Sequence, residues 1–381
     1  MRIIHFCLCG PVTDGMRYQE NILAKLHREQ GNEVLMAATC AGYDETGTVV
    51  RFRPGRCRFQ DGFDVIRLPE RPVFRVGPLR RVRMFQSVRT LLEEFRPEII
   101  FFHGISSCEL YTIARWCGEH PSVTLWIDNH ADRNNSATNA LSLHVQHRLM
   151  YRRALHAALP YAKKVLCISL ECMDFAREVY GVPEEKLEFY PLGGELLPAQ
   201  ELRKRRAACR TAEGAGEDEV IFLHTGKMGA LKKTTDVIRA FRSVKAPHAR
   251  LWIAGVLMDE IRDEALALME GDDRIRFLGW KSGEELGAYL CAADVYVQPG
   301  TQSATMQRAM CCGCAMLLYP HRSHEPYLDG NGFFVQSEAD LLHTMETLST
   351  EPETRYAMQK KSIEIARKLL DYEQLAARVL K

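Results

Sequence analysis

The feature that most constrains the fold of this chain is an alternation of short apolar segments with longer amphipathic ones. The first series begins with the apolar run 2–9, continues with an amphipathic stretch that ends at Gly31, and reaches a second apolar run at 33–39. Short apolar runs are typical of buried strands, whereas apolar residues three and four positions apart are typical of helices. Strands that alternate with helices form parallel sheets, because each connection crosses back over the sheet. We therefore expect an α/β fold.

A second series of the same kind follows residues 191–217, where the chain becomes rich in glycine and then in charged residues. Its apolar segments are, in order along the chain, 220–226, 250–255, 275–280, 294–300 and 314–320. We predict two doubly wound Rossmann-like domains that face each other across a cleft. Residues 1–194 form the first domain, residues 195–365 form the second, and a C-terminal helix at 366–381 packs back on the first. Open α/β sheets bind ligands where their strands end, so we look for functional residues in the loops that follow strands.

The composition limits the classes of partner. The net charge of the 381 residues is +1, which gives no general attraction to nucleic acid. Thirteen cysteines, an odd number with no paired CxxC units, favour free thiols over a disulfide framework or a zinc site. No apolar run approaches the ~20 residues that cross a bilayer. We expect a cytoplasmic protein without a metal or cofactor, which works alone or at the inner face of a membrane.

A lysine-rich loop gives the strongest local signal for a ligand site. In "HTGKMGALKK" (224–233), an apolar strand ends at Gly226, Lys227 follows, and Lys232 and Lys233 precede a helix. Free N–H groups at a helix N-terminus and nearby ammonium groups provide a good site for a phosphate or diphosphate. A solvated lysine cluster is the alternative, and the residues alone do not decide between them.

Four further segments, together with this loop, resemble one family. They are the first strand with its glycine turn, "NILAKLHREQGNEVLMAAT" (21–39), "VLCISLECMDFAREVYGVPEEKLEFYPLG" (165–193) and "IRFLGWKSGEELGAYLCAADVYVQP" (275–299). In this order they resemble the retaining glycosyltransferases of family 4, which have the GT-B fold. The resemblance spans nearly the whole chain. It places Lys227 and Lys232 on the arginine and lysine that hold the donor's diphosphate.

The stretch "PGTQSATMQRAMCCG" (299–313) departs from the family pattern. The family carries two glutamates, one that contacts the donor sugar and one that contacts the ribose, whereas this chain has Gly300 and Arg308 at those positions. We consider three alternatives: neutral hydrogen bonds to the donor, an unusual donor, or lost catalysis. The neutral groups that would bind the donor are Gln302, Ser303, Thr305 and Gln307.

Arg308 in the first turns of a helix is the second peculiarity of this stretch. A cation is disfavoured there by ~0.3–1 kcal/mol, unless it pairs with a diphosphate or a sugar carboxylate. We expect Ser303 or Thr305 to cap this helix, and Ala304 leaves room for a ligand. The alternative is that the Arg308 side chain points into solvent.

Three further residues are candidates on separate segments. His130, after the apolar run 122–128, lies where the family often has a histidine near the donor sugar; the alternative is a structural histidine. Gly15, in the first loop, permits close approach of a ligand to the backbone. Trp280 either stacks on the nucleotide base or packs between domains.

Asp128 and Asp132 have the spacing of a metal site, but nothing else supports one, and we expect none.

Residues 71–89, "RPVFRVGPLRRVRMFQSVR", carry six arginines and no acidic residue. We predict a helix over 79–95, with an apolar stripe formed by Leu79, Val82, Phe85 and Val88. Such a helix is typical of contact with anionic lipid and would suit a lipid-linked acceptor. An ordinary surface helix is the alternative.

The resemblance implies transfer of a sugar, with retention, from a nucleotide-sugar donor to a glycan or polyprenyl-linked acceptor. Cell-surface polysaccharide synthesis, including that of lipopolysaccharide, is the process it implies. His130, Lys227 and Lys232 are the catalytic candidates. Gly15, Gly226, Trp280, Gln302, Ser303, Ala304, Thr305 and Arg308 are the donor-binding candidates. Two alternatives stay open: a non-catalytic nucleotide-sugar-binding or scaffolding homologue, and a sugar-nucleotide epimerase.

Overall fold

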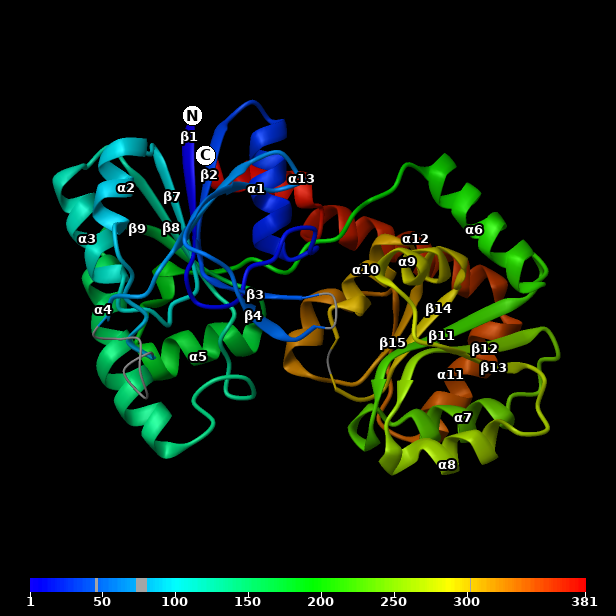
Figure 1. Cartoon of the computed structure of the whole chain (residues 1–381). Coiled ribbons are helices and arrows are strands. Elements are labelled where there is room, and N and C mark those ends of the chain that lie inside the picture. The colour runs from blue at the N-terminus through cyan, green and yellow to red at the C-terminus, as the bar shows by residue number, and fades with distance from the viewer. Residues whose placement is uncertain (45–46, 73–80, 302) are drawn as a thin grey trace. The chain divides into compact units, whose positions relative to one another are not determined.

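The computed structural model describes residues 1–44, 47–72, 81–301 and 303–381 as two compact units (Figure 1). Unit 1 comprises Met1–Pro191 and Tyr372–Lys381, and unit 2 comprises Leu192–Asp371. Each unit has its own parallel sheet with helices on both faces, so the predicted class of two doubly wound Rossmann-like domains is confirmed. The sequence placed the terminal helix at 366–381. In the structure only Tyr372–Lys381 belong to unit 1, because residues 366–369 continue a helix of unit 2.

The sheet of unit 1 has eight strands in the order β10-β9-β8-β7-β1-β2-β6-β5, all parallel except β5. Its strands are β1 (Arg2–Cys7), β2 (Glu33–Thr39), β5 (Gly55–Arg58), β6 (Asp64–Leu68), β7 (Ile99–His103), β8 (Thr124–Asn129), β9 (Ala162–Cys167) and β10 (Leu187–Phe189). A separate antiparallel hairpin consists of β3 (Ala41–Tyr43) and β4 (Val49–Arg51). The order reverses on the two sides of β1, which is the point where ligands of such sheets bind.

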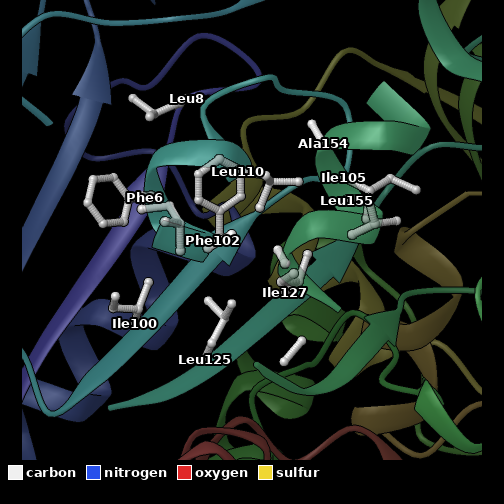
Figure 2. Close-up of a cluster of buried hydrophobic side chains, with 14 of the residues drawn as sticks. Phe6, Leu8, Ile100, Phe102, Ile105, Leu110, Leu125, Ile127, Ala154 and Leu155 are labelled. Carbon is white, nitrogen blue, oxygen red and sulfur yellow. The ribbon is translucent and has the colours of Figure 1, made fainter. Parts of the chain in front are cut away.

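Alternate residues of the unit 1 strands supply two cores. Ile4 and Phe6 of β1 face the core that is covered by α2 (Val88–Phe95), α3 (Leu110–Glu119), α4 (Arg152–Ala158) and α5 (Leu170–Tyr180). Figure 2 shows Phe6, Phe102 and Ile127, from three neighbouring strands, in this core. Ile3 and Cys7 face the other core, which α1 (Gln19–Glu29) and α13 (Tyr372–Val379) cover. The C-terminal helix therefore completes the apolar packing of unit 1.

The sheet of unit 2 has six parallel strands in the order β13-β12-β11-β14-β15-β16. Its strands are β11 (Val220–Met228), β12 (Ala249–Leu257), β13 (Ile275–Gly279), β14 (Val295–Gln298), β15 (Ala315–Leu318) and β16 (Gly332–Phe334). One face is covered by α7 (Thr234–Arg242), α8 (Asp259–Met269) and α11 (Glu338–Thr350). The other face is covered by α9 (Gly283–Ala292), α10 (Thr305–Cys311) and α12 (Pro352–Leu369). A long helix, α6 (Ala199–Glu213), precedes the first strand and packs on α9.

Short helices and one unusual helix complete the described elements. The 3₁₀ helices are η4 (Glu184–Lys186), η5 (Ala230–Lys232) and η6 (Arg322–Tyr327). The helical segment that follows the loop after β8 begins as a π-helix, η3 (Ser142–Tyr151), and continues as α4. All thirteen cysteines are free thiols. None of the helices in the described part of the chain combines the length and hydrophobicity that a membrane span requires.

The helix predicted over 79–95 is wrong at its N-terminal half. Residues 73–80, which include Leu79, lie outside the described residues, and α2 begins only at Val88. Arg83 and Ser87 have left-handed backbone conformations, with φ of 51° and 62°. A continuous α-helix therefore cannot pass through these two residues. Phe85 and Val88 of the predicted apolar stripe are buried in the core of unit 1. These two side chains are therefore unavailable to a membrane.

Candidate functional sites in the two units

A cavity of about 220 Å³ lies in unit 1 where β1, β7 and β8 end. Its polar lining includes Glu20 from the first turn of α1, His103 from the end of β7, and His130 from the loop after β8. The backbone of Gly10 and Pro11 closes another side. The position agrees with the rule that ligands of parallel sheets bind beyond the carboxyl ends of the strands.

Asp128 is a fully buried acid at the end of β8, and it contacts three groups that line this cavity. Its Oδ1 accepts the backbone N–H of Gly104 at 2.7 Å, and its Oδ2 accepts Nδ1–H of His103 at 2.5 Å. Oδ2 also lies 3.3 Å from Nε2 of His130. Burial alone would raise the pKa of Asp128, but the two histidines hold it well below its usual range. Asp128 is therefore ionised at neutral pH.

His130 was predicted from the sequence and does line the cavity, with 36% of its side chain exposed. Burial tends to lower its pKa, but the charge and hydrogen bond of Asp128, and the charge of Glu20, raise the pKa to about 9. At neutral pH the ring is an imidazolium. It can donate hydrogen bonds to a sugar or an anion, but it cannot act as a base until it loses a proton.

A chain of buried histidines, which the sequence reasoning missed, extends from Asp128 to the C-terminal helix. Nε2 of His103 lies 2.9 Å from Nδ1 of His5, and Nε2 of His5 lies 3.0 Å from Nδ1 of His27. Nε2 of His27 lies 3.0 Å from the carbonyl oxygen of Ala376 in α13. The chain thus joins the cavity to the last helix of unit 1.

The ends of this chain fix its charge. The chain has four hydrogen bonds: one between His103 and Asp128, two between the rings, and one from His27 to Ala376. The Asp128 carboxylate and the Ala376 carbonyl can only accept, so each of the four bonds needs a proton on a histidine nitrogen. Three neutral imidazoles supply three, so the chain holds one extra proton, which the carboxylate balances. Burial lowers the pKa of His5, and it lowers the pKa of His27 to about 4. Of the three rings, His103 is the one in contact with the carboxylate that balances the extra proton.

Gly15, the other candidate in unit 1, lies in the first loop but does not line this cavity. Its φ is +75°, and an added Cβ would lie 2.3 Å from Nε2 of Gln60. The close neighbour of Gly15 is thus a side chain of the same unit. Gly10 provides the backbone surface of the cavity instead.

The candidate site of unit 2 lies where β11 ends. Lys232, at the end of η5, is partly buried, and its Nζ donates to the carbonyl of Thr301 at 2.8 Å. Burial lowers the pKa of Lys232. A Cβ added to Gly226 would lie 3.6 Å from Cε of Lys232, so the lysine stem passes directly over this glycine. The structure thus brings Gly226 and Lys232 together, whereas Lys227 lies exposed at the penultimate position of β11.

The absence of an acid at position 300 has a steric cause. A Cβ on Gly300 would lie 2.1 Å from the carbonyl oxygen of Leu231 and 2.8 Å from Cα of Lys232. The N–H of Thr301 donates to that same Leu231 carbonyl at 3.1 Å. The lysine loop is therefore packed directly on the backbone after β14, and no side chain fits at this position.

Arg308 does not simply point into solvent, which was the alternative that we considered from the sequence. Its Nη2 donates to the carbonyl of Gly283 at 2.8 Å, which ties α10 to the first residue of α9. The side chain is thus directed along the protein surface and not into solvent. A role of Arg308 in donor binding stays a prediction.

The other candidates of unit 2 lie around the start of α10 and after β13. Ala304 is the N-cap residue and makes no side-chain cap, so the capping predicted for Ser303 or Thr305 is wrong. Instead Oγ of Ser303 accepts the N–H of Thr305 at 3.3 Å. Trp280 is 70% exposed, so its indole is not packed. Gln302 lies outside the described residues.

Lys233 is a further polar residue of this region. It adopts a left-handed conformation (φ 55°) as the N-cap residue of α7, and its Nζ lies 4.8 Å from the ring centre of Tyr319. Nζ also donates to the carbonyl of Gln336 at 3.1 Å. Lys232 and Lys233 therefore point to different neighbours, although the sequence presents them as one cluster.

Metal binding finds no support in the described residues. No group of three or more histidine, cysteine or acidic side chains among them could hold a metal ion. Asp132, the second acid of the spacing that we considered for a metal site, instead accepts the backbone N–H groups of Asn134 and Asn135, each at 2.8 Å. This acid therefore belongs to a turn.

Family comparisons agree with this two-unit arrangement. Residues 15–193 match the model of the glycosyl transferase 4-like domain, and residues 219–351 match the model of glycosyl transferases group 1. The first match covers most of unit 1, and the second falls within unit 2. By family and fold, the chain is a GT-B glycosyltransferase.

Solved structures show that this glycosyltransferase shares its fold with distant proteins over its full length. HepE of Anabaena, in complex with UDP, is 16% identical with a TM-score of 0.68, covering 100% of this chain and 98% of that one. Sucrose-phosphate synthase of Thermosynechococcus elongatus is 16% identical with a TM-score of 0.65 (99% and 96%). WaaG, a glycosyltransferase involved in lipopolysaccharide biosynthesis, is 16% identical with a TM-score of 0.62 (99% and 99%). No curated protein sequence matches significantly.

Proposed function

We propose that this glycosyltransferase is catalytically active and takes its sugar from a nucleotide-diphosphate donor, which unit 2 binds. The observation that carries the proposal is the position of Lys232, partly buried at the end of η5, just beyond β11, with its side chain against Gly226. A partly buried ammonium group gains most from an anionic ligand, because burial has removed part of its hydration. The N-terminus of α7 begins at the next residues and adds free N–H groups.

The proposed chemistry needs no protein nucleophile. The acceptor hydroxyl attacks the anomeric carbon on the face that the diphosphate leaves, the glycosyl–phosphate bond breaks, and a phosphate oxygen takes the hydroxyl proton. The configuration is thereby retained. Lys232 and the more exposed Lys227 stabilise the charge that develops on the diphosphate, which is the largest kind of contribution that such a site makes.

We assign to His130 the role of a hydrogen-bond donor to the hydroxyl groups of the transferred sugar. Its imidazolium form, held by Asp128, matches this role better than that of a general base. No metal or cofactor enters the proposal.

The nature of the substrates is inferred from similar proteins. One similar structure, HepE, is described in complex with UDP and another with UDP-glucose, which supports a nucleotide-sugar donor for this chain. WaaG is described as acting in lipopolysaccharide biosynthesis. We propose by analogy a glycan or lipid-linked acceptor in the synthesis of a cell-surface polysaccharide. The cytoplasmic location stays a prediction.

A thermal-shift screen tests the proposal. UDP-, GDP-, ADP- and CMP-sugars are each added to the full chain, and a donor at 100 times its dissociation constant should stabilise the fold by about 2.7 kcal/mol. We expect one of the diphosphate classes, UDP-, GDP- or ADP-sugars, to raise the melting temperature and Lys232→Ala to abolish the shift; the CMP-sugars, which have a single phosphate, are the control. If no nucleotide sugar stabilises the protein, the non-catalytic scaffolding alternative is favoured. Release of an epimerised sugar without acceptor would favour an epimerase.

A further inference from the structure

Unit 1 contains a second, larger cavity of about 610 Å³, next to the one at His130. Its walls come from the loop after β1, the end of β2, strand β4 of the hairpin, and the segment 81–85. Cys9, Gly10 and Pro11 line both cavities, so the two adjoin along this backbone. The volume is in the range of sites for small organic ligands, ~300–1,000 Å³.

The described lining of this larger cavity carries more positive than negative charge. Arg51, Arg81 and Arg83 line it, and Glu70 is the one acidic residue among its described lining residues. Glu70 forms an ion pair with Arg51, with Oε2 3.2 Å from Nη2. The described lining thus has two guanidinium groups in excess. Arginine keeps its charge at all relevant pH values and binds phosphate or carboxylate with a fixed fork of N–H donors.

The segment that carries these arginines is held in place before any ligand arrives. Arg83 has a left-handed backbone conformation, and its Nη1 donates to the carbonyl of Ser106 at 2.8 Å. Its own carbonyl accepts the hydroxyl of Ser107 at 2.8 Å. The hydroxyl of Tyr151 donates to the carbonyl of Arg81. Because the backbone of this positively charged wall is already fixed, it loses little conformational entropy when a ligand binds, which favours affinity. Unusual backbone conformations are also often found at binding sites.

The rest of the lining is apolar. Val49, Val50 and Phe85 contribute, and Val49 is 59% exposed although it is a large apolar side chain. Such a surface suits the carbon skeleton that carries an anionic group. The cavity therefore combines a cationic wall, an apolar wall and contact with the site of His130.

We propose that the larger cavity binds an acceptor that carries an anionic group, a phosphate or a carboxylate, at Arg81 and Arg83. This inference rests on the proposed function, because the adjoining cavity at His130 is the one assigned to the transferred sugar. It narrows the acceptor class, since a neutral acceptor would leave the two guanidinium groups without a counter-charge among the described lining residues.

Methyl NMR of the full chain tests the inference, with the methyl groups of Val49 and Val50 as reporters of the cavity. Methyl phosphate and methyl glucuronide are the anionic probes, and methyl glucoside is the neutral match of the glucuronide. We expect one or both anions, but not the glucoside, to shift these signals. Arg81→Gln should weaken the binding roughly ten-fold or more, because it removes a charge-assisted hydrogen bond. Arg53→Gln, at an exposed arginine outside the lining, should change nothing.

The outcomes separate this inference from the proposed function. A shift with methyl phosphate alone identifies a phosphorylated acceptor, and one with methyl glucuronide alone identifies a carboxylate. Equal shifts with the glucoside, no shifts, or binding that Arg81→Gln leaves unchanged would overturn the inference. The methyl groups of Leu231, which is 76% exposed beside Lys232, report separately on UDP, GDP and ADP. If Leu231 responds and Val49 does not, only this inference fails; if none of the nucleotides moves Leu231, the proposed function fails.

Discussion

The carboxyl-terminal edges of the two sheets consist of different kinds of groups. In unit 1 the edge is a network of ionisable side chains, in which one buried carboxylate holds two histidines and a chain of rings behind them. In unit 2 the edge is mostly backbone: two glycines let a lysine loop lie directly on neighbouring strands. Unit 1 is therefore most sensitive to changes of charge and protonation, and unit 2 to changes of volume. Changes of charge in unit 1 and changes of volume in unit 2 test this contrast.

The largest effect is expected when the buried charge of unit 1 is removed. Asp128→Asn keeps the shape but leaves the positive charge of His130 and the extra proton of the histidine chain without their counter-ion. Breaking a buried ion pair in this way costs about 3–5 kcal/mol in the free energy of unfolding. Urea denaturation measures this value. Asp132→Asn, the same change on the exposed turn that follows, should cost less than about 0.5 kcal/mol. Equal effects of the two changes would contradict the role of Asp128.

A smaller loss is expected when volume is added to the edge of unit 2. Gly300→Ala places a Cβ against the Leu231 carbonyl, so the lysine loop must move. Overpacking of this kind costs about 1–3 kcal/mol of stability. Donor binding, measured by calorimetry, should weaken as well, because Lys232 moves with the loop. Gly283→Ala, where no atom lies within 4 Å of the added Cβ, is the matched control. Unchanged stability in Gly300→Ala would show that the loops are not in contact.

The protonation of His130 gives a prediction of about 1 kcal/mol. Because its pKa is raised from 6.5 to about 9 on folding, the stabilisation is fully present below pH 6.5 and is lost as the pH rises through 9. With 36% of the side chain exposed, solvent screening limits the effect to about 1 kcal/mol. The difference in unfolding free energy between the wild type and His130→Gln should shrink to zero between these pH values. A difference that does not depend on pH would argue against the imidazolium.

The last of these predictions concerns the protons of the histidine chain and needs no mutation. With ¹⁵N-labelled histidine, His5, His27 and His103 should together show four N–H protons at neutral pH. Three protons would mean that one of the four hydrogen bonds is absent. The edge of unit 1 would then not be a continuous network of hydrogen-bonded ionisable side chains, and the contrast with unit 2 would be wrong.

The sequence predicted the fold well, because alternating apolar and amphipathic segments determine an α/β architecture through short-range patterns. It failed at residues 83–87, where the arginine-rich stretch has helical spacing but contacts with Ser106 and Ser107 hold it in another conformation. Those contacts join residues more than 20 positions apart, and no local pattern reveals them.

The candidate sites were predicted in part for the same reason. Gly226, Lys232 and His130 lie at or shortly after the ends of strands, so their positions could be inferred from the chain order. The chain from His103 to His5 and His27 could not, because these residues come from β7, β1 and α1 and carry no shared motif. The N–H and carbonyl contacts that exclude a side chain at Gly300 leave no trace in the sequence other than the glycine itself.

The most direct test of the central claim, that Lys232 stabilises the departing diphosphate, is the rate of sugar transfer by Lys232→Ala. With the donor identified by the thermal-shift screen, we expect a fall of about 100- to 1,000-fold in kcat, by analogy with the loss of one oxyanion-hole donor. Lys245→Ala, at an exposed lysine beyond the end of α7, should retain the wild-type rate. A rate for Lys232→Ala within a factor of two of the wild type would contradict the account.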